Sequence, residues 1–434
     1  MDAKFLIRVE DTDLDRNQPE HVAVIFEVLN WLGIGADAEP VYQSSLASQH
    51  SEAVDQLLAA GHAYRCDCTQ EESKARAEAR GRPGYDGYCR DRGVTANATS
   101  VVRFRTPDEG TTSWDDLIRG NVSFENSNLE DFVLLRADGT PMFIVANTVD
   151  DAAMGITHVI RGEDLINVTP KMLLVRDALG HAERPTFAHL PLIVNEQRKK
   201  LSKRRDDVSV ASYVERGFLP EAMVNYLALL GWGPPDGVEV RPLSEIIELF
   251  DVVDINPSPA MFDVKKLESI NGDYIRALPA EEFAERSMPY IETAVWIDRF
   301  DEAKFAAIAP EIQTRVKVLS EVPGYVDFLF LERPVIENDA WAKAITNNEA
   351  AGGVLTAAIA TYGELAGEWR AEPLHAATLA LAEQAGLKLG KAQAPIRAAV
   401  TGRTVGPPLF ESLELLGPDV VLGRLRSALD SLGH

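Results

Sequence analysis

The hydrophobic periodicity of the chain changes near its middle, and this change limits the folds open to it. Apolar runs typical of strands occur at residues 4–9 and 157–160, with a helical pattern at residues 19–32 between them. Alternation of strands and helices is typical of a parallel sheet with crossover helices. Beyond residue 206, strand patterns nearly vanish and helical periodicity continues to residue 432. We therefore predict an α/β first half and a mostly helical second half.

Residues 62–135 interrupt the alternation and differ from their surroundings. They contain all three cysteines and a Gly/Pro-rich turn at residues 81–87. We interpret them as an insertion into the α/β domain. The other predicted elements are a helix at 51–60, strands at 101–105, 132–135 and 142–149, and a hairpin turn at Asp138-Gly139.

Composition excludes several classes of protein. The 434 residues suffice for more than one domain, and 46% of them are hydrophobic, as in ordinary globular proteins. No stretch is long and apolar enough for a membrane span or a secretory signal, so we expect a cytoplasmic protein with no membrane partner. The formal charge of −24 argues against binding nucleic acid over the whole surface. Any polyanion must therefore meet a local basic patch.

One basic run stands out in this acidic chain. Residues 198–205 contain six Lys or Arg residues, followed by Asp206 and Asp207. Lysines on a Ser-containing loop can stabilise the charge that develops on nucleotide phosphates during phosphoryl or adenylyl transfer. A solvated surface loop is the alternative interpretation of the run taken by itself.

The run also resembles a known motif. Lys200-Leu201-Ser202-Lys203-Arg204 resembles the KMSKS loop of class I aminoacyl-tRNA synthetases, and Arg8-Val9-Glu10-Asp11-Thr12-Asp13 resembles the R-x-E-D-T-D segment of bacterial glutamyl-tRNA synthetases. Further family-like segments follow in the family's order at residues 149–151, 154–164, 169–170 and 262–271. The similarity covers most of residues 4–275 and is specific.

The resemblance implies an α/β Rossmann-like class I synthetase catalytic domain, N-terminally truncated, with an inserted acceptor-binding subdomain and an all-α C-terminal anticodon-binding region. The expected divisions are 1–61 and 136–205 for the two catalytic parts, 62–135 for the insertion, 206–275 for a helical stem-contact domain and 276–434 for the anticodon-binding domain. An all-helical C-terminus favours the glutamyl over the glutaminyl branch. The implied activity is ATP-dependent charging of tRNA(Glu) with L-glutamate.

The resemblance also assigns residues. Glu10 is expected to meet the ammonium of glutamate, Arg161 one of its carboxylates, and Asn147 to add a hydrogen bond. An ion pair of Arg161 with Glu163 or Asp164 is the alternative for that arginine. Lys200, Ser202 and Lys203 are the expected catalytic residues, and ATP is expected on Lys200, Lys203 and Arg204 together with Mg²⁺.

The cysteines suggest a structural metal. Cys66, Cys68 and Cys89, with Tyr85, resemble the zinc site in the acceptor-binding insertion of many glutamyl-tRNA synthetases. Asp86 or water could replace Tyr85 as the fourth ligand. The alternative is three reduced cysteines that pack as small hydrophobic residues. His158 and His189 have no partner identifiable from sequence, so we expect core or supporting roles for them.

Family members begin with a further strand and a helix that carries a His-Ile-Gly-His type motif, and Met1 falls after both. We expect that a chain lacking them is impaired in charging, and that a start codon placed too far downstream explains the difference. Two other hypotheses remain: a non-catalytic paralogue or fragment that binds tRNA or glutamate, and a pantothenate synthetase-like nucleotidyltransferase. We expect a monomer, which binds tRNA(Glu) and could also charge tRNA(Gln).

Overall fold

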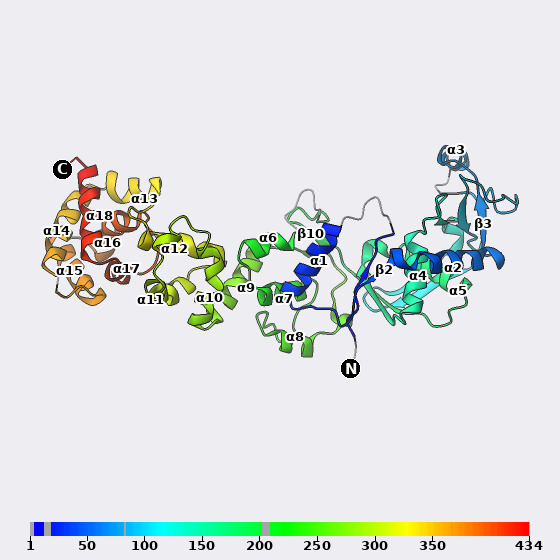
Figure 1. Cartoon of the computed structure of the whole chain (residues 1–434), viewed down its shortest axis with the longest axis horizontal. Helices are drawn as coiled ribbons and strands as arrows, with labels where there is room; N and C mark the ends of the chain where they lie inside the picture. Colours follow the sequence, from blue (N-terminus) through cyan, green and yellow to red (C-terminus); the bar gives the residue numbers. More distant parts are fainter. Residues whose placement is uncertain (1–3, 13–18, 82–83, 202–208, 366, 434) are drawn as a thin grey trace. The chain divides into compact units, whose positions relative to one another are not determined.

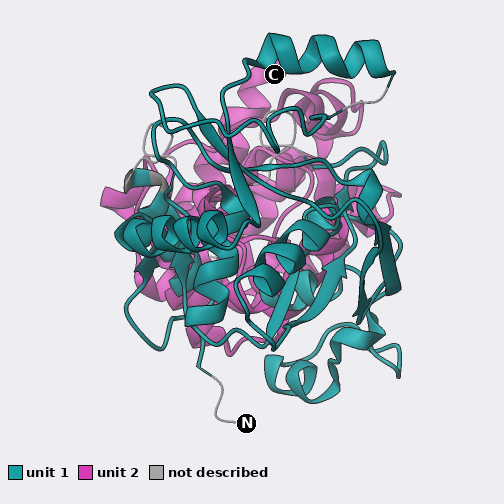
Figure 2. Cartoon of the chain, turned by 90° about the vertical axis from the view of Figure 1, so that its right-hand side faces the viewer, with its two compact units in different colours: residues 1–208, 224–263 teal, residues 209–223, 264–434 magenta. Residues whose placement is uncertain are grey.

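A computed structural model of the chain (Figure 1) describes residues 4–12, 19–81, 84–201, 209–365 and 367–433. The chain divides into two compact units, coloured separately in Figure 2. Unit 1 comprises residues 1–208 and 224–263, and unit 2 comprises residues 209–223 and 264–434. None of the helices in the described ranges is both long and apolar enough to cross a bilayer.

A four-stranded mixed sheet in unit 1 carries part of the candidate functional site. Its strand order is β6-β5-β9-β8, with bounds Gly120–Glu125, Thr111–Asp116, Thr186–Leu190 and His158–Gly162. β8 and β9 are parallel and are connected through α5 (Thr169–Ala178), as a strand-helix-strand crossover requires. β5 and β6 form an antiparallel hairpin that joins β9 through a single residue pair, Asp116 with Phe187. Strands of the predicted insertion, residues 62–135, thus extend a sheet whose other two strands, β8 and β9, lie after it in the chain.

The other parallel strands are short. β1 (Arg8–Val9) pairs with β2 (Val41–Tyr42) across α1 (Pro19–Trp31), and β10 (Ile193–Val194) pairs with β11 (Ala260–Met261). The strand predicted at residues 4–9 is therefore reduced to two residues. Two-residue strands form few ladder hydrogen bonds, and the parallel strands lie in separate sheets rather than in the one sheet that alternation suggested.

An antiparallel sheet forms most of the rest of the insertion. Its order is β3-β4-β7, with bounds Ala63–Cys66, Val101–Phe104 and Val133–Leu135. Phe104 and Phe132 stack with ring centroids 5.1 Å apart in the core beneath α2 (Ala47–Ala59). After β3, α3 (Gln70–Arg80) begins with a capping box in which Thr69 and Glu72 each accept the other's backbone N–H.

The strand predicted at residues 142–149 is wrong: Phe143–Ala153 is the helix α4. Its residues Ile144, Val145 and Val149 face the core shared with α2 and α5. A short apolar run rich in β-branched residues fits a strand and a buried helix equally well, so packing decides between them. The correction matters because α4 carries Asn147.

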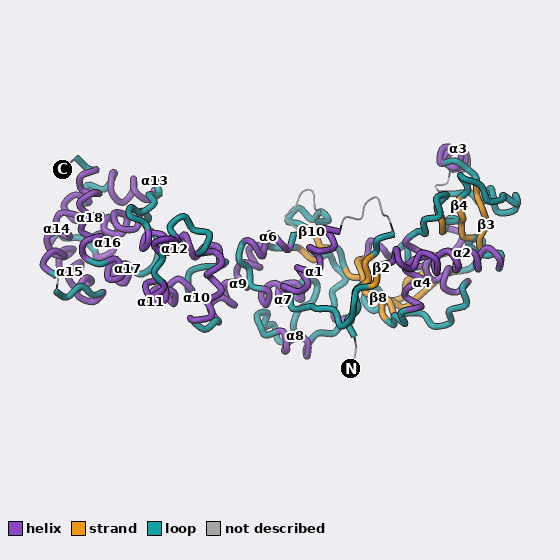
Figure 3. Tube along the Cα trace, in the orientation of Figure 1, coloured by secondary structure: helices purple, strands orange, loops and turns teal. Residues whose placement is uncertain are grey.

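The helical second half is confirmed. Beyond residue 206, the strands in the described part of the chain are limited to β11, and α-helices make up most of the regular structure (Figure 3). These helices are α6 Val210–Glu215, α7 Pro220–Ala228, α8 Leu243–Leu249, α9 Val264–Ala277, α10 Ala280–Ile291, α11 Glu302–Gln313, α12 Val322–Phe330, α13 Asn338–Trp341, α14 Ala351–Glu364, α15 Ala371–Gln384, α16 Leu389–Thr401, α17 Leu409–Leu416 and α18 Pro418–Ser431.

Candidate functional site

The structure brings Glu10 and Asn147 together. Asn147 lies on the buried face of α4, and its Nδ2 donates to Glu10 Oε1 at 2.8 Å. Its Oδ1 accepts from Gln43 Nε2 at 2.7 Å, and that amide also donates to Asp150 at 2.8 Å. These bonds fix which way the Asn147 amide faces, because its oxygen is already occupied.

Two carboxylates on α4 support this arrangement. Asp150 is fully buried, and its Oδ1 lies 2.7 Å from His50 Nε2. Asp151 forms an ion pair with Arg8 at 2.8 Å. Burial raises the pKa of Asp151, although Arg8 acts in the opposite direction. Residues 149–151 were expected only as part of the family resemblance, and no role was predicted for Gln43 and His50.

Arg161 lies on β8 beside this polar group. The ion pairs proposed as its alternative are excluded by geometry, since Glu163 pairs with Arg119 at 2.6 Å and Asp164 pairs with Lys200 at 2.6 Å. Among the described residues, the hydrogen-bond partners of Arg161 are neutral: His189, Thr169 and Met172. Burial lowers the pKa of Arg161, and the charges of Asp151, Glu10 and Asp116 oppose that shift. A partly buried cation without its own carboxylate suits an anionic ligand.

His189 has a role that the sequence did not reveal. Its side chain is fully buried, which confirms the expected core or supporting position, and its Nδ1 lies 2.5 Å from Asp116 Oδ2. The same expectation is wrong for His158, which is exposed on the outermost strand of the sheet and contacts Thr157. Asp116 is separated from His189 by 73 residues, and no local pattern relates the two.

The described residues include only the first part of the basic run, residues 198–201. Lys200 follows a tight turn in which Asn195 Oδ1 accepts from the backbone N–H of Lys199 at 3.1 Å, and it is exposed apart from its ion pair with Asp164. This hydrogen bond with Lys200 lowers the pKa of Asp164. The predicted residues Ser202, Lys203 and Arg204 lie outside the described residues.

The four predicted metal ligands also come together. The sulfur atoms of Cys66, Cys68 and Cys89 all lie within 4.8 Å of one another. Tyr85 Oη lies 3.4 Å from Cys66 Sγ and 3.9 Å from Cys68 Sγ, and it accepts the backbone N–H of Cys89 at 2.9 Å. Asp86, the alternative ligand, is instead paired with Arg76 at 2.9 Å.

The surroundings of this Cys/Tyr cluster act differently on its thiols. Arg76 and Arg92 donate to the sulfurs of Cys68 and Cys89 at 3.0 and 3.3 Å. Although burial acts to raise it, the pKa of Cys66 is lowered by hydrogen bonds, the strongest with Tyr85. Burial and the contact with Cys89 raise the pKa of Cys68 to about 11. Three thiols and a phenol at these separations fit the four-ligand, sulfur-rich site that zinc prefers.

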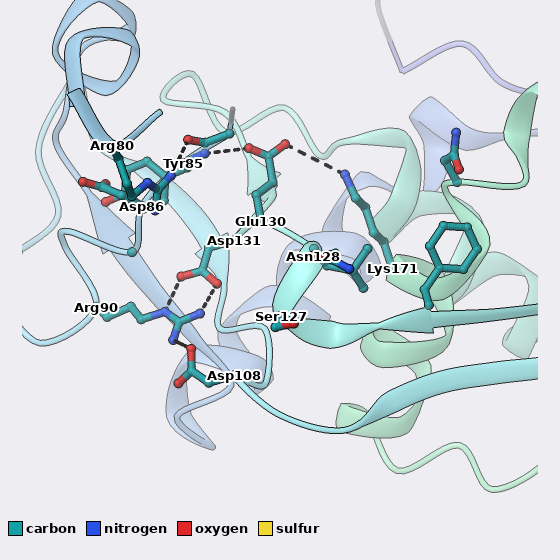
Figure 4. A pocket seen from close by; sticks show the side chains of 15 residues that line it. Arg80, Tyr85, Asp86, Arg90, Asp108, Ser127, Asn128, Glu130, Asp131 and Lys171 are labelled. Carbon is teal, nitrogen blue, oxygen red and sulfur yellow. Dashed lines mark hydrogen bonds and ion pairs between the residues drawn. The ribbon is translucent and has the colours of Figure 1, made fainter. Parts of the chain in front are cut away.

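A cleft of about 660 Å³ opens beside the cluster (Figure 4). Two of its cations are matched by acids: Arg90 binds Asp131 and Asp108, and Lys171 lies 4.0 Å from Glu130. The Asp131 carboxylate also accepts from Tyr64 and from the backbone of Thr106. These contacts tie the turn at Arg90 to the antiparallel sheet.

Comparison with known proteins covers both halves of the chain. Residues 1–269 match the profile of tRNA synthetases class I (E and Q), catalytic domain, and residues 282–429 match an anticodon binding domain. The glutamate-tRNA ligase of Thermobifida fusca is 52% identical over 440 residues, which cover 99% of this chain and 91% of that protein. That of Salinispora arenicola is 51% identical, covering 98% and 91%.

A solved structure agrees with these matches. The glutamate tRNA ligase from Elizabethkingia meningosepticum, in complex with its amino acid, superposes with a TM-score of 0.85 at 28% identity, covering 99% of this chain and 93% of that one.

Proposed function

The chain belongs to the class I tRNA synthetases for glutamate and glutamine, and from this premise we propose that it ligates L-glutamate to tRNA(Glu). The single observation that carries the choice of amino acid is Arg161. It is a partly buried cation whose neighbouring acids, Glu163 and Asp164, are paired elsewhere. A substrate carboxylate supplies the missing counter-charge, and Glu10, close to Asn147, supplies an anion for the ammonium group.

The reaction proceeds in two steps. The α-carboxylate of glutamate attacks the α-phosphate of ATP, which gives glutamyl-adenylate and releases pyrophosphate. A ribose hydroxyl of the 3′-terminal adenosine of tRNA then attacks the acyl carbon, and AMP leaves. Arg161, Glu10 and Asn147 hold the amino acid in line for the first attack, so their contribution is mainly orientation.

The basic run serves the phosphates. Lys200, Ser202, Lys203 and Arg204 stabilise the charge that builds on the leaving pyrophosphate, and bound Mg²⁺ would share that charge. In the structure Lys200 pairs with Asp164, so ATP would have to compete for this lysine. Such an exchange costs little, because exposed ion pairs contribute only about 0–1 kcal/mol.

Zinc would be held by Cys66, Cys68, Cys89 and Tyr85. A closed set of four protein ligands leaves no position for a substrate, so the metal would supply structural stability to the insertion. We propose that residues 62–135 contact the acceptor end of tRNA, that residues 206–275 contact its stem, and that residues 276–434 read the anticodon of a tRNA bound by a monomer.

Attachment of labelled glutamate to purified tRNA(Glu), with ATP and Mg²⁺, tests the function. Charging of tRNA(Glu) would support the proposal, and a parallel reaction with tRNA(Gln) measures the breadth of tRNA choice. Arg161→Ala is the matched variant and should abolish glutamate-dependent product. Binding of tRNA with steep salt dependence but no charging would instead indicate a non-catalytic tRNA-binding protein.

A further inference from the structure

Asp116 ends β5 and is almost completely buried. Its Oδ1 accepts three backbone N–H groups, from Ile118, Arg119 and His189, each at 3.1 Å. Its Oδ2 faces His189 Nδ1 at 2.5 Å. Although burial acts to raise it, the pKa of Asp116 is lowered by these hydrogen bonds, so the group is a carboxylate near neutral pH.

The carboxylate determines the tautomer of His189. A carboxylate only accepts hydrogen bonds, so His189 Nδ1 carries a proton. Burial lowers the pKa of His189, which keeps the ring neutral near pH 7 and leaves Nε2 as an acceptor. The groups that face Nε2 are donors: Arg161 Nε at 3.3 Å and Thr169 Oγ1 at 3.0 Å. Thr169 Oγ1 in turn accepts from Arg161 Nη2 at 2.8 Å.

One edge of the Arg161 guanidinium is therefore occupied. Nε and Nη2, which form the side-on edge, are held by His189 and Thr169. A guanidinium has five N–H groups, and the contacts with His189, Thr169 and Met172 use three. Nη1 and Nη2 together form the end-on edge, which can bind both oxygens of one carboxylate, and the thioether of Met172 is only a weak acceptor at Nη1.

We propose that Asp116 and His189 are positioning residues for glutamate: they hold the side-on edge of Arg161 so that its end-on edge meets the substrate carboxylate. The proposal rests on the proposed function, in which Arg161 binds glutamate. Asp116 comes from the predicted insertion, whereas Arg161 and His189 come from the catalytic segments. The amino-acid site is thus completed by a strand of the insertion.

Asp116→Asn is the sharpest test. The three backbone N–H groups at Oδ1 force the amide oxygen of asparagine into that position, so its NH₂ group faces His189 Nδ1. The imidazole must then place its proton on Nε2, where it opposes the N–H of Arg161 Nε. We expect the KM for glutamate to rise about 10–100-fold, with the KM for ATP unchanged and kcat altered much less.

Two readouts separate this role from a merely structural one. Long-range ¹H–¹⁵N spectra of the full chain with labelled histidine should show the His189 proton on Nδ1 in the wild type and on Nε2 in Asp116→Asn. In an Arg161→Lys background, Asp116→Asn should add little further loss, because it acts through Arg161. Asp115→Asn, on the same strand and bonded to Asn121 at 2.8 Å, is the matched control and should change neither readout.

Three outcomes would overturn the proposal: a wild-type proton on Nε2, a switched tautomer with unchanged KM for glutamate, or a multiplicative loss in the double variant. Failure of the proposed function looks different, because Arg161→Lys alone would then leave the KM for glutamate unchanged. Should Asp116→Asn fail to fold, Thr169→Val removes the second hydrogen-bond partner of Arg161 and keeps the shape of the side chain at position 169. It should raise the KM for glutamate about tenfold, and an unchanged KM would contradict the proposal.

Discussion

The Cys/Tyr cluster and the Arg161 site, which comprises Arg161, His189, Thr169, Glu10 and Asn147, have opposite electrostatics within unit 1. The cluster gathers four groups that can become anions, with Arg76 and Arg92 donating to its sulfurs, and it fits a cation. The Arg161 site holds a cation, with acids nearby that lower its desolvation cost but do not pair with it, and it fits an anion. In both, the protein prepares for a ligand by supplying the complementary charge without neutralising it completely.

The two regions also differ in how far apart in sequence their residues lie. All four ligand groups of the cluster fall between residues 66 and 89, on β3 and the turns that follow. The Arg161 site draws on residues in or next to β1, α4, β8, β9 and β5, so its residues are separated by up to 179 positions, between Glu10 and His189. A site built from distant segments depends more on supporting contacts, and the following changes test that difference.

The largest effect is expected at Arg161. Arg161→Lys keeps the charge but loses the planar guanidinium, so it cannot bond His189, Thr169 and a carboxylate together. We expect kcat/KM for glutamate to fall about 10²–10³-fold. Steady-state charging of tRNA measures this. Arg184→Lys is the control, because Arg184 pairs with Asp177 at the surface, and an equal loss there would contradict the assignment.

Removal of a cluster thiol should be next in size. Cys66→Ala deletes a fully buried ligand, so zinc affinity should fall by more than about 100-fold and the melting temperature should drop. Metal content after dialysis and thermal unfolding in the presence of a chelator measure the two effects. A wild-type protein that contains no zinc and is insensitive to chelator would show that the cysteines pack as small hydrophobic residues.

The fourth ligand can be identified by a pair of variants. Tyr85→Phe removes the oxygen nearest the thiols and should weaken zinc binding about tenfold. Asp86→Asn should leave zinc affinity unchanged, because Asp86 is engaged with Arg76. Competition against a chromophoric chelator measures both, and the reverse order of effects would assign the site to Asp86.

Acidification should lower the free energy of unfolding through His189 in the Arg161 site. The pKa of His189 is lowered by burial in the folded state, so the unfolded chain binds its proton first, near pH 6.5. The free energy of unfolding should fall as the pH drops below about 6.5, by at most about 1.4 kcal/mol per pH unit for this proton. Asp116, with a lowered pKa, loses its contribution only below about pH 4.

Urea unfolding at pH 7.5 and 5.5 checks this pH dependence. His189→Gln should lose less stability over that interval than the wild type. Equal losses in the two proteins would show that another group carries the proton.

The smallest effect is expected at the exposed pair of Lys200 with Asp164. Asp164→Asn should change stability by less than about 1 kcal/mol, since both side chains are half exposed. Thermal unfolding measures it. A larger loss would mean that the turn at residues 195–200 depends on this ion pair.

Sequence alone predicted those elements and site residues whose pattern is contained in a short stretch of the chain. The helix at 19–32, the strand at 157–160, the helical second half and the four cluster residues are found close to where they were expected. The strand at 142–149 was mistaken because a helix buried on α2 and α5 carries no polar stripe in its first turns. Asp116, Gln43 and His50 were missed because their partners lie 73 to 107 residues away in the sequence.

The junction between β5 and β9 has a consequence for modular engineering. Exchange of residues 62–135 with the equivalent segment of a distant relative would carry Asp116 away with the donated piece, while Arg161 and His189 stayed with the recipient. Such a chimera would keep its entire catalytic sequence and still inherit its amino-acid affinity from the donor. The boundary between the two modules therefore lies at the contact of the Asp116 carboxylate with the His189 imidazole, and not in a linker.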